Sequence, residues 1–190
     1  MSKRAISPHN ERGGALVFVL LILAVIIGLT AMGTSTVELQ VATNDARHKI
    51  AFAQADGAAE FSCELLEQNI SCPGGFPVTT VGLLEVTSPA LWMNTSASIP
   101  SDSNRDLYYP TGYAQGASHT NVRVGGVTTL STGGAIQMAA GYEGKGKGAP
   151  SGGAQVTYDI YSEHLGNFSS KAIVMLQWRH VIGQEGTCLY

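Results

Sequence analysis

Residues 14–33 form a run of 20 residues without a charged side chain, GALVFVLLILAVIIGLTAMG. At a rise of 1.5 Å per residue, a helix of this length is about 30 Å long, which is the hydrocarbon thickness of a lipid bilayer. The run is apolar on every face, so it lacks the polar side of a helix that lies on a membrane surface. We therefore predict a helix that spans a membrane.

The 13 residues before this run are polar, and they are basic on balance: Lys3, Arg4 and Arg12 stand against one acid, Glu11. Because basic residues stay on the cytoplasmic side, we expect a single-pass inner-membrane protein with a cytoplasmic N-terminus and a periplasmic or extracellular C-terminal domain. A secretory signal peptide fits poorly, since its apolar core has about 7–15 residues and no Ala-x-Ala site follows this run. An uncleaved signal anchor remains an alternative.

The helical pattern continues beyond the apolar run, from residue 34 to residue 70, without a proline. Apolar or small residues recur at steps of three or four, as on one face of an α-helix; they are Leu39, Ala42, Ala46, Ile50, Ala53, Gly57, Phe61 and Leu65. A second face is acidic, with Asp56, Glu60, Glu64 and Glu67. The pattern ends at Cys72, where Pro73, Gly74 and Gly75 predict a firm stop.

The two parts together predict one helix of about 55 residues, roughly 80 Å long at the standard rise. Its amphipathic half, residues 34–72, is expected to bury the stripe against the domain formed by residues 73–190. A linker or a short coiled coil is the alternative, although the stripe is rich in Ala and Gly for a coiled-coil seam. The apolar half must lie in lipid or against other apolar helices, where Gly28, Ala31 and Gly33 allow close approach.

Beyond residue 73, Gly, Ser, Thr and Asn dominate and strand-like patterns appear. Residues 155–162 alternate, with Val156, Tyr158 and Ile160 on one side, and a second alternation includes Ala172, Val174, Leu176, Trp178, His180 and Ile182. A hairpin turn is expected at residues 165–168. Weaker strands are expected at 121–130, broken by Gly125 and Gly126, and at 135–139. Residues 82–118 and 141–153 are expected to be loops. The fold class is therefore α+β, a long helix packed on a small antiparallel sheet.

The composition and the histidines favour a binding or structural role over chemistry. The net charge is −3, and the 11 Lys and Arg residues form no block, so no nucleic-acid binding is expected. The histidines form no HExxH, and Ser118 beside His119 is not in a GxSxG motif. His180 is expected to be a core histidine, and Glu163 with His164 is expected in a solvated turn. We expect no catalytic site and no cofactor.

Two loop-like sequences resemble ligand-binding motifs without meeting their requirements. Residues 102–106, DSNRD, have the oxygen spacing of a calcium loop, but Leu107 stands where such a loop needs Gly and no Glu completes it. Residues 144–148, GKGKG, lack the spacing of a phosphate-binding loop and a following helix. We therefore expect an Asx-rich loop and a surface loop, and no metal site.

Three cysteines, Cys63, Cys72 and Cys188, allow one disulfide and one free thiol if this part of the chain is exported. They form no CxxC pattern. We favour a bond between Cys72 and Cys188 that ties the tail to the end of the helix, and a Cys63–Cys72 bond is the alternative.

The N-terminal third carries two sequence motifs that resemble those of known pilin-like proteins. Residues 11–13, ERG, before the apolar run resemble the leader of type IV prepilins, which is cut after its last Gly. Residues 35–60, STVELQVATNDARHKIAFAQADGAAE, are similar to the PilX N-terminal domain. The matching positions are Glu38, Ala42, Asn44, Ala51, Phe52, Ala55, Asp56, Ala58 and Ala59. The resemblance covers residues 10–70, and the tail 158–183 resembles the family's terminal hairpin only loosely.

The resemblance implies cleavage after Gly13 by a prepilin peptidase and N-methylation of Gly14. It also implies partners: other pilins or pseudopilins through the N-terminal helix, and the inner-membrane assembly platform. Major pilins carry Glu at the fifth residue after the cut, where this chain has Phe18. A carboxylate at that depth in lipid is costly and is kept for a function, thought to be pairing with a neighbouring N-terminal amine. Phe18 therefore suggests a rare subunit rather than a bulk one.

The sequence is compatible with three classes of function. The first is a minor pilin that takes part in type IV pilus assembly, at initiation, at the tip or in regulation, with a pseudopilin of a type II-like secretion system as its close variant. The second is a membrane-anchored adhesin-like binding module, which the Gly- and Ser-rich loops permit. The third is a signal-anchored extracytoplasmic enzyme, for which His119 and His164 are the remaining candidates.

Overall fold

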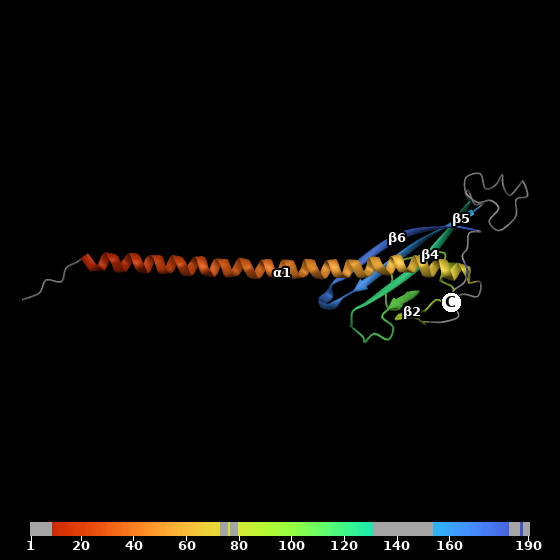
Figure 1. Cartoon of the computed structure of the whole chain (residues 1–190), viewed down its shortest axis with the longest axis horizontal. Helices are drawn as coiled ribbons and strands as arrows, with labels where there is room; N and C mark the ends of the chain where they lie inside the picture. The colour runs from red at the N-terminus through yellow and green to blue at the C-terminus, as the bar shows by residue number, and fades with distance from the viewer. Residues whose placement is uncertain (1–8, 73–75, 77–79, 131–153, 183–186, 188–190) are drawn as a thin grey trace, which may run out of the picture. The chain divides into compact units, whose positions relative to one another are not determined.

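The structure, a computed structural model, describes residues 9–72, 76, 80–130, 154–182 and 187. The chain divides into two units, residues 1–46 and 47–190. The helix α1 runs from His9 to Ser71 (Figure 1). The expected long helix is confirmed, and it ends two residues before Pro73, where a helix cannot readily continue.

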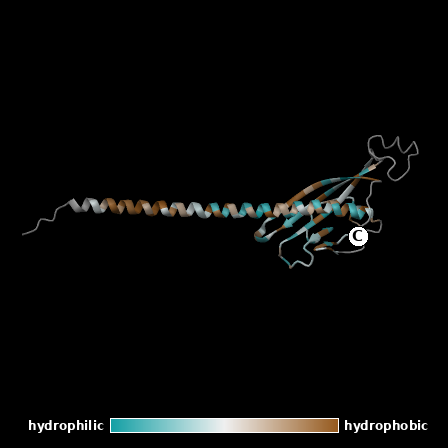
Figure 2. Ribbon diagram, viewed as in Figure 1, coloured by the Kyte–Doolittle hydropathy of each residue, from teal (hydrophilic) through white to brown (hydrophobic). Residues whose placement is uncertain are grey.

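The first unit consists of the N-terminal part of α1. The large apolar side chains described in it are exposed, by fractions that run from 42% for Ile22 to 72% for Met32. Residues of high hydropathy dominate this part of the helix, whereas polar residues become frequent further along (Figure 2). By length and composition the helix can cross a membrane, and its most apolar window is not buried at all.

The second unit contains a six-stranded antiparallel sheet whose strands are neighbours in sequence order, β1 to β6 (Figure 1). The strands are β1 Thr80–Val81, β2 Leu84–Val86, β3 Leu107–Tyr109, β4 His119–Leu130, β5 Ala154–Leu165 and β6 Lys171–Val181. Two 3₁₀ turns accompany them, η1 Leu91–Met93 and η2 Asn167–Ser169. The three long strands carry most of the pairing, so β4, β5 and β6 form the framework of the unit.

The core of this unit lies between the C-terminal part of α1 and one face of the sheet. Leu65 and Leu66 of α1 cluster with Val122, Val124 and Ile160 of β4 and β5. Tyr158 is also buried there, its hydroxyl donates to the carbonyl of Trp92 at 3.0 Å, and burial raises the pKa of this phenol to about 12. Burying these side chains removes apolar surface from water and fixes the helix on the sheet.

The prediction that the apolar stripe of α1 packs on the sheet is wrong. Ile50 is 61% exposed, Phe61 is 41% exposed, and only Leu65 of the predicted stripe within the second unit is buried. The buried face instead consists mainly of small residues, joined towards its C-terminal end by one leucine and one amide: Ala51, Ala55, Ala59, Ser62, Leu66 and Asn69. Small side chains let the helix backbone approach the strands closely, so packing distance rather than hydrophobicity selects this face.

The alternating patterns of the last two strands are confirmed. Tyr158 and Ile160 of β5 and Ala172 of β6 are buried, and the strands pair along their whole length from Leu165↔Lys171 to Gln155↔Val181. The expected turn is also present, and it contains Phe168 in the left-handed region at φ 57°. Glu163 and His164, however, do not lie in this turn. They belong to β5 and are buried, so the prediction of a solvated pair is wrong.

Two further predictions about this unit are wrong. The strand β4 is continuous through Gly125 and Gly126, where a break was predicted. Glycine is present there because neighbouring residues leave no room for a side chain. A Cβ atom at Gly125 would overlap the backbone of Ser96, and one at Gly126 would lie 2.5 Å from Cε1 of Tyr158. The region 82–118 is not loop throughout, since it contains β2, η1 and β3. The predicted strand at 135–139 and the predicted loops at 141–153 and 144–148 lie outside the described residues.

Candidate functional site

Thr30, Thr34 and Thr36 lie in or just after the apolar run of α1, and each hydroxyl donates a hydrogen bond to a carbonyl of the preceding turn. The hydroxyl of Thr30 donates to the carbonyl of Ile27 at 2.9 Å, and that of Thr34 donates to Ala31 at 3.0 Å. Thr36 makes the same bond to Gly33 at 2.8 Å. Hydroxyls that are satisfied within the helix can enter an apolar medium at a reduced cost. This segment therefore suits lipid or a bundle of apolar helices.

The residues of this helix that were predicted to take part in processing or filament packing are spread along its exposed surface and do not gather into a pocket. Gly13, Gly14, Gly28 and Gly33 have open space around them, and Phe18 is 67% exposed. Gly13 and Gly14 both lie inside α1. The described residues leave this part of the helix open, so lipid or other apolar helices can contact it.

The residues of the expected family motif separate into two groups. Glu38, Asn44 and Phe52 are exposed, and Asp56 is partly exposed. Three alanines of the same motif are buried: Ala51 and Ala55 pack with Ala172 of β6, and Ala59 belongs to the main core. The buried alanines of the motif therefore form part of the face on which α1 packs on the sheet. The sequence had predicted that the adjacent apolar stripe would form this face.

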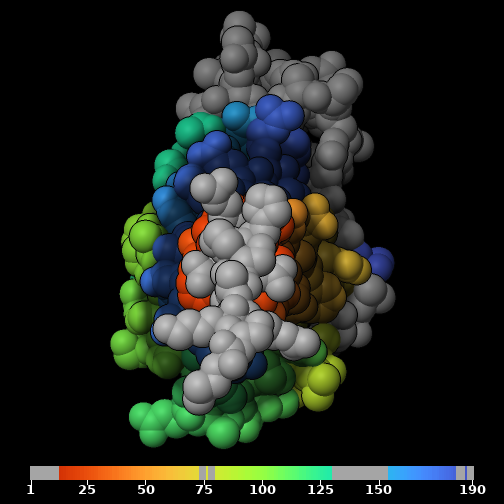
Figure 3. All heavy atoms as spheres, turned by 90° about the vertical axis from the view of Figure 1, so that its left-hand side faces the viewer, coloured from red at the N-terminus to blue at the C-terminus, as the bar shows by residue number. Residues whose placement is uncertain are grey.

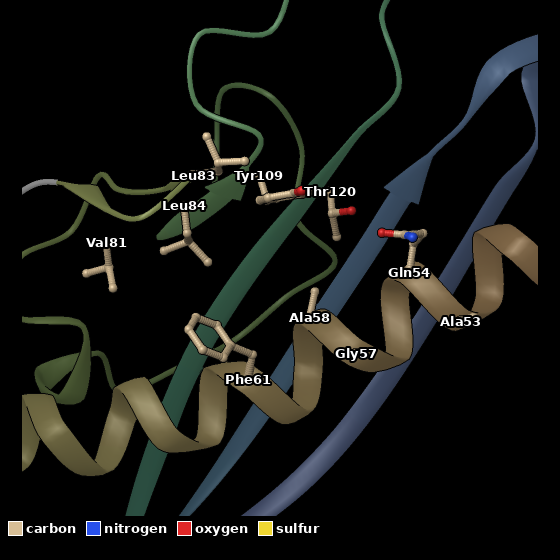
Figure 4. A pocket seen from close by; sticks show the side chains of 10 residues that line it. All are labelled: Ala53, Gln54, Gly57, Ala58, Phe61, Val81, Leu83, Leu84, Tyr109 and Thr120. Atoms are coloured by element: carbon tan, nitrogen blue, oxygen red, sulfur yellow. The ribbon is translucent and has the colours of Figure 1, made fainter.

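An open groove runs along α1 within the second unit, with a volume of about 440 Å³. Ala53, Gly57 and Phe61 of α1 line one side, and Leu83 and Tyr109 lie on the other (Figure 4). In the space-filling view, gold atoms of this part of α1 and yellow-green atoms of the β1–β2 region reach the same side of the surface (Figure 3). The sequence signal was the apolar stripe itself, since Ala53, Gly57 and Phe61 belong to it.

A polar cluster lies at the start of β4, where His119 is buried. Its Nε2 lies 2.7 Å from Oδ1 of Asp102, and its Nδ1 lies 2.7 Å from the carbonyl of Ala117. Asn121 donates to the same Asp102 oxygen at 2.9 Å. Hydrogen bonds from Asn121 and His119 lower the pKa of the Asp102 carboxyl, although burial opposes them. The carboxylate that resembled a calcium ligand is therefore bound to protein donors.

Aromatic rings and a guanidinium complete this cluster. Tyr113 stacks on His119 with ring centroids 4.0 Å apart, and Arg105 lies 3.7 Å above the ring of Tyr108. Arg105 also donates to the hydroxyl of Tyr113 at 2.7 Å. These contacts hold the segment between β3 and β4 against the sheet. Within the described part of the chain, no three His, Cys, Asp or Glu side chains gather so as to hold a metal ion.

Ser118 and His164 form the pair closest to a catalytic arrangement. The Ser118 hydroxyl lies 3.2 Å from Nε2 of His164, and Nδ1 of His164 lies 2.8 Å from the hydroxyl of Thr120. A nucleophilic triad has a carboxylate in the position of Thr120, where it stabilises the imidazolium that forms. Burial and the neighbouring His119 lower the pKa of His164, which also disfavours that imidazolium. The arrangement suits a structural hydrogen-bond chain better than acyl transfer.

The cysteines and the last histidine lie near the C-terminal end of α1. Cys72 is buried and disulfide-bonded, and Cys63 is a free thiol whose pKa is raised by burial and by Glu60. The alternative Cys63–Cys72 bond is therefore wrong, while Cys188 lies outside the described residues and its pairing stays a prediction. His180 is buried and hydrogen-bonded to Glu67, as expected for a core histidine.

One long N-terminal helix packed on an antiparallel sheet is a pilin-like α+β arrangement. Residues 12–60 match the PilX N-terminal family, which confirms the resemblance predicted from the sequence over this segment. The match supports a pilin function related to type IV pili and implies interaction with pilus components in general. The apolar helix fits a membrane-anchored subunit. No curated protein and no solved structure matches the chain.

Proposed function

We propose that this chain is a minor pilin-like subunit that takes part in type IV pilus assembly, in initiation, at the tip or in regulation, and that it performs no chemistry of its own. One observation carries the proposal: an apolar helix without cover, residues 14–33, lies in the segment that matches the PilX N-terminal family. Such a helix is stable in lipid before assembly and against other apolar helices afterwards.

The proposal includes the processing and the topology of the chain. A prepilin peptidase removes residues 1–13, and Gly14 becomes a methylated N-terminus. The chain crosses the inner membrane once, with its N-terminus in the cytoplasm and the sheet domain in the periplasm, before it enters the filament with other pilins at the assembly platform. The basic residues before the apolar run support this orientation. Phe18 supports a rare subunit, because it offers no carboxylate to a neighbouring amine.

Filaments sheared from a piliated host that expresses the chain test this proposal. We expect the chain in the sheared fraction, at a small fraction of the major subunit, and we expect Gly13→Glu to remove it by blocking cleavage. Asn10→Glu adds the same charge three residues earlier and should leave incorporation unchanged. A wild-type chain that stays in the membrane fraction while the major subunit is sheared off would contradict the proposal.

A further inference from the structure

A polar pocket with a volume of about 270 Å³ lies beside β3 in the second unit, away from the groove along α1. Its lining combines two aromatic rings, two charged side chains, one amide and one glycine: Asp102, Arg105, Tyr108, Gly112, Tyr113 and Gln115. None of these residues lines the groove. The pocket is smaller than the roughly 300–1,000 Å³ of sites that take drug-sized ligands, so it suits a single small ring.

The side chains of this pocket hold one another in place. The guanidinium of Arg105 lies 3.7 Å above the ring of Tyr108. Its Nη1 donates to the hydroxyl of Tyr113 at 2.7 Å and to Oδ1 of Asn121 at 2.8 Å. The Tyr113 ring in turn stacks on the buried His119. Because these groups are ordered before a ligand arrives, binding costs little further conformational entropy.

Polar atoms at the pocket remain open for a ligand. Asp102 binds its protein donors through Oδ1, so its Oδ2 holds no hydrogen bond within the described residues, and its side chain is 60% exposed. Nε and Nη2 of Arg105 hold none within the same residues, and neither is a buried unpaired atom. Gln115 is exposed, and its amide can both donate and accept. The pocket therefore offers donors and acceptors together.

The charges of the pocket disfavour an ionic ligand. Nη1 of Arg105 lies 3.9 Å from Oδ1 of Asp102, so a ligand meets both charges at once. An anion drawn to the guanidinium is repelled by the carboxylate, and a cation meets the reverse. A neutral molecule with several hydroxyls suits both groups, since each hydroxyl can donate to a carboxylate and accept from a guanidinium.

The aromatic rings favour a ligand that also has an apolar side. Tyr108 and Tyr113 are partly exposed where they line the pocket. Aromatic rings bury apolar groups favourably while their hydroxyls stay polar. A sugar ring combines the two features that this lining requires, because its hydroxyls point outward around a frame of C–H groups. Its single ring also fits the small volume.

We propose that this pocket binds one sugar ring of a saccharide. The hydroxyls of the ring bind Oδ2 of Asp102 and the free nitrogens of Arg105, and its C–H groups pack on the tyrosine rings. Gln115 binds a further hydroxyl at the rim. The site is additional to the assembly role proposed above, because its residues all belong to the second unit and none lies on α1.

Saturation-transfer difference NMR on the full chain, in micelles of a detergent without a sugar headgroup, tests the site. The probes are the methyl glycosides of glucose, galactose, mannose and N-acetylglucosamine, each at up to about 20 mM, because contact with one ring is weak. We expect at least one glycoside to receive saturation from aromatic protons of the protein. An absence of transfer to all four would overturn the proposal.

A variant of the exposed amide locates the binding. Gln115→Ala should weaken binding of the same glycoside roughly fivefold, since one hydrogen bond is lost. Gln54→Ala is the matched control, because Gln54 is also exposed but lines the groove beside α1, and affinity should stay unchanged. An unchanged affinity in Gln115→Ala, or an equal loss in Gln54→Ala, would overturn the assignment to this pocket.

A variant of the guanidinium separates a sugar site from an anion site. Arg105→Lys keeps the positive charge but removes the planar set of donors, so we expect at least about tenfold weaker binding of the glycoside. Inorganic phosphate at about 20 mM should not displace the glycoside from the wild-type chain, because Asp102 repels it. Displacement by phosphate, or unchanged affinity in Arg105→Lys, would overturn the proposal.

Discussion

Nδ1 of His180 lies 3.0 Å from Oε2 of Glu67, although 113 positions separate the two residues. The bond joins the last strand, β6, to the C-terminal part of α1. His180 is only 5% exposed, so the hydrogen bond with Glu67 takes the place of a bond to water at Nδ1 of the imidazole. The sequence predicted a core position for His180 but did not indicate that Glu67, a residue of the acidic helix face, would be its partner.

Glu67→Ala should therefore lower the free energy of unfolding by roughly 1–2 kcal/mol, because a buried hydrogen bond to an ionisable group is lost. Urea unfolding in detergent, followed by tryptophan fluorescence, measures this well, since Trp178 lies 5.6 Å from the His180 ring. Glu64→Ala on the exposed side of α1 is the matched control and should change stability by less than about 0.5 kcal/mol. Equal effects of the two variants would contradict the assigned pairing.

The buried face of α1 can be tested by enlarging one alanine on each candidate face. Ala55 is completely buried and packs with Ala172, so Ala55→Leu should destabilise the second unit by roughly 1–3 kcal/mol through overpacking. Ala53 is exposed at the groove, and Ala53→Leu should be close to neutral. Chemical unfolding of both variants compares them directly. A larger loss for Ala53→Leu would restore the face predicted from the sequence and refute the one observed.

His164 should make the domain less stable in mildly acidic solution. Burial and the neighbouring His119 lower the pKa of His164 from its ordinary value of 6.5, so the unfolded chain binds the proton more readily than the folded chain. Its contribution is therefore complete above pH ~6.5 and is lost progressively as the pH falls below that value. Unfolding curves at pH 7.5 and pH 5.5 measure the loss. His164→Gln should flatten this dependence, and a variant that keeps the full slope would argue against His164 as its source.

A second acid-sensitive window lies lower, where carboxylates titrate. Hydrogen bonds from Asn121 and His119 lower the pKa of Asp102, and those from Thr111 and Tyr108 lower the pKa of Glu85. Stabilisation from a carboxylate with a lowered pKa is present above its unfolded pKa, about 4, and is lost as the pH falls further. Asp102→Asn should therefore reduce the slope of stability below pH ~4 while leaving the slope between pH 7.5 and 5.5 in place.

The disulfide predicts a specific peptide map. Cys72 is bonded and Cys63 is free, so non-reducing digestion should release a peptide pair that joins Cys72 to Cys188. Iodoacetamide should alkylate Cys63 slowly in the folded chain and rapidly in urea, because partial burial and Glu60 raise the pKa of that thiol. A Cys72 peptide linked to any other cysteine would disprove the pairing. Rapid alkylation of Cys63 in the folded chain would disprove its burial.

The parts of the fold that the sequence predicted share long periodic patterns. The apolar run and the helical period after it predicted the helix, although not its buried face, and β5 and β6 are long enough, at 12 and 11 residues, for alternation to be recognised. The strands β1, β2 and β3 have only two or three residues each, which is too short for a period. They exist because of pairing with distant residues, such as Leu107 with Val122.

The candidate site was less accessible to sequence reasoning. The apolar stripe of α1 was recognised, but hydrophobicity could not tell whether its own sheet or another molecule covers it; the alanine face won because it permits a closer approach. Asp102 and His119 lie on either side of β3 in the sequence, and no spacing rule predicts the contact between them. What the sequence did predict was the long apolar helix, because a charge-free run of about 20 residues is typical of a helix that lies in an apolar medium.

The intact mass of the chain, expressed with and without a prepilin peptidase, tests the central claim most directly. The account predicts that the peptidase removes residues 1–13 and that the product carries one added methyl group on Gly14. An identical, uncut mass in both preparations would contradict it, and the chain would then be a signal-anchored protein rather than a pilin-like subunit.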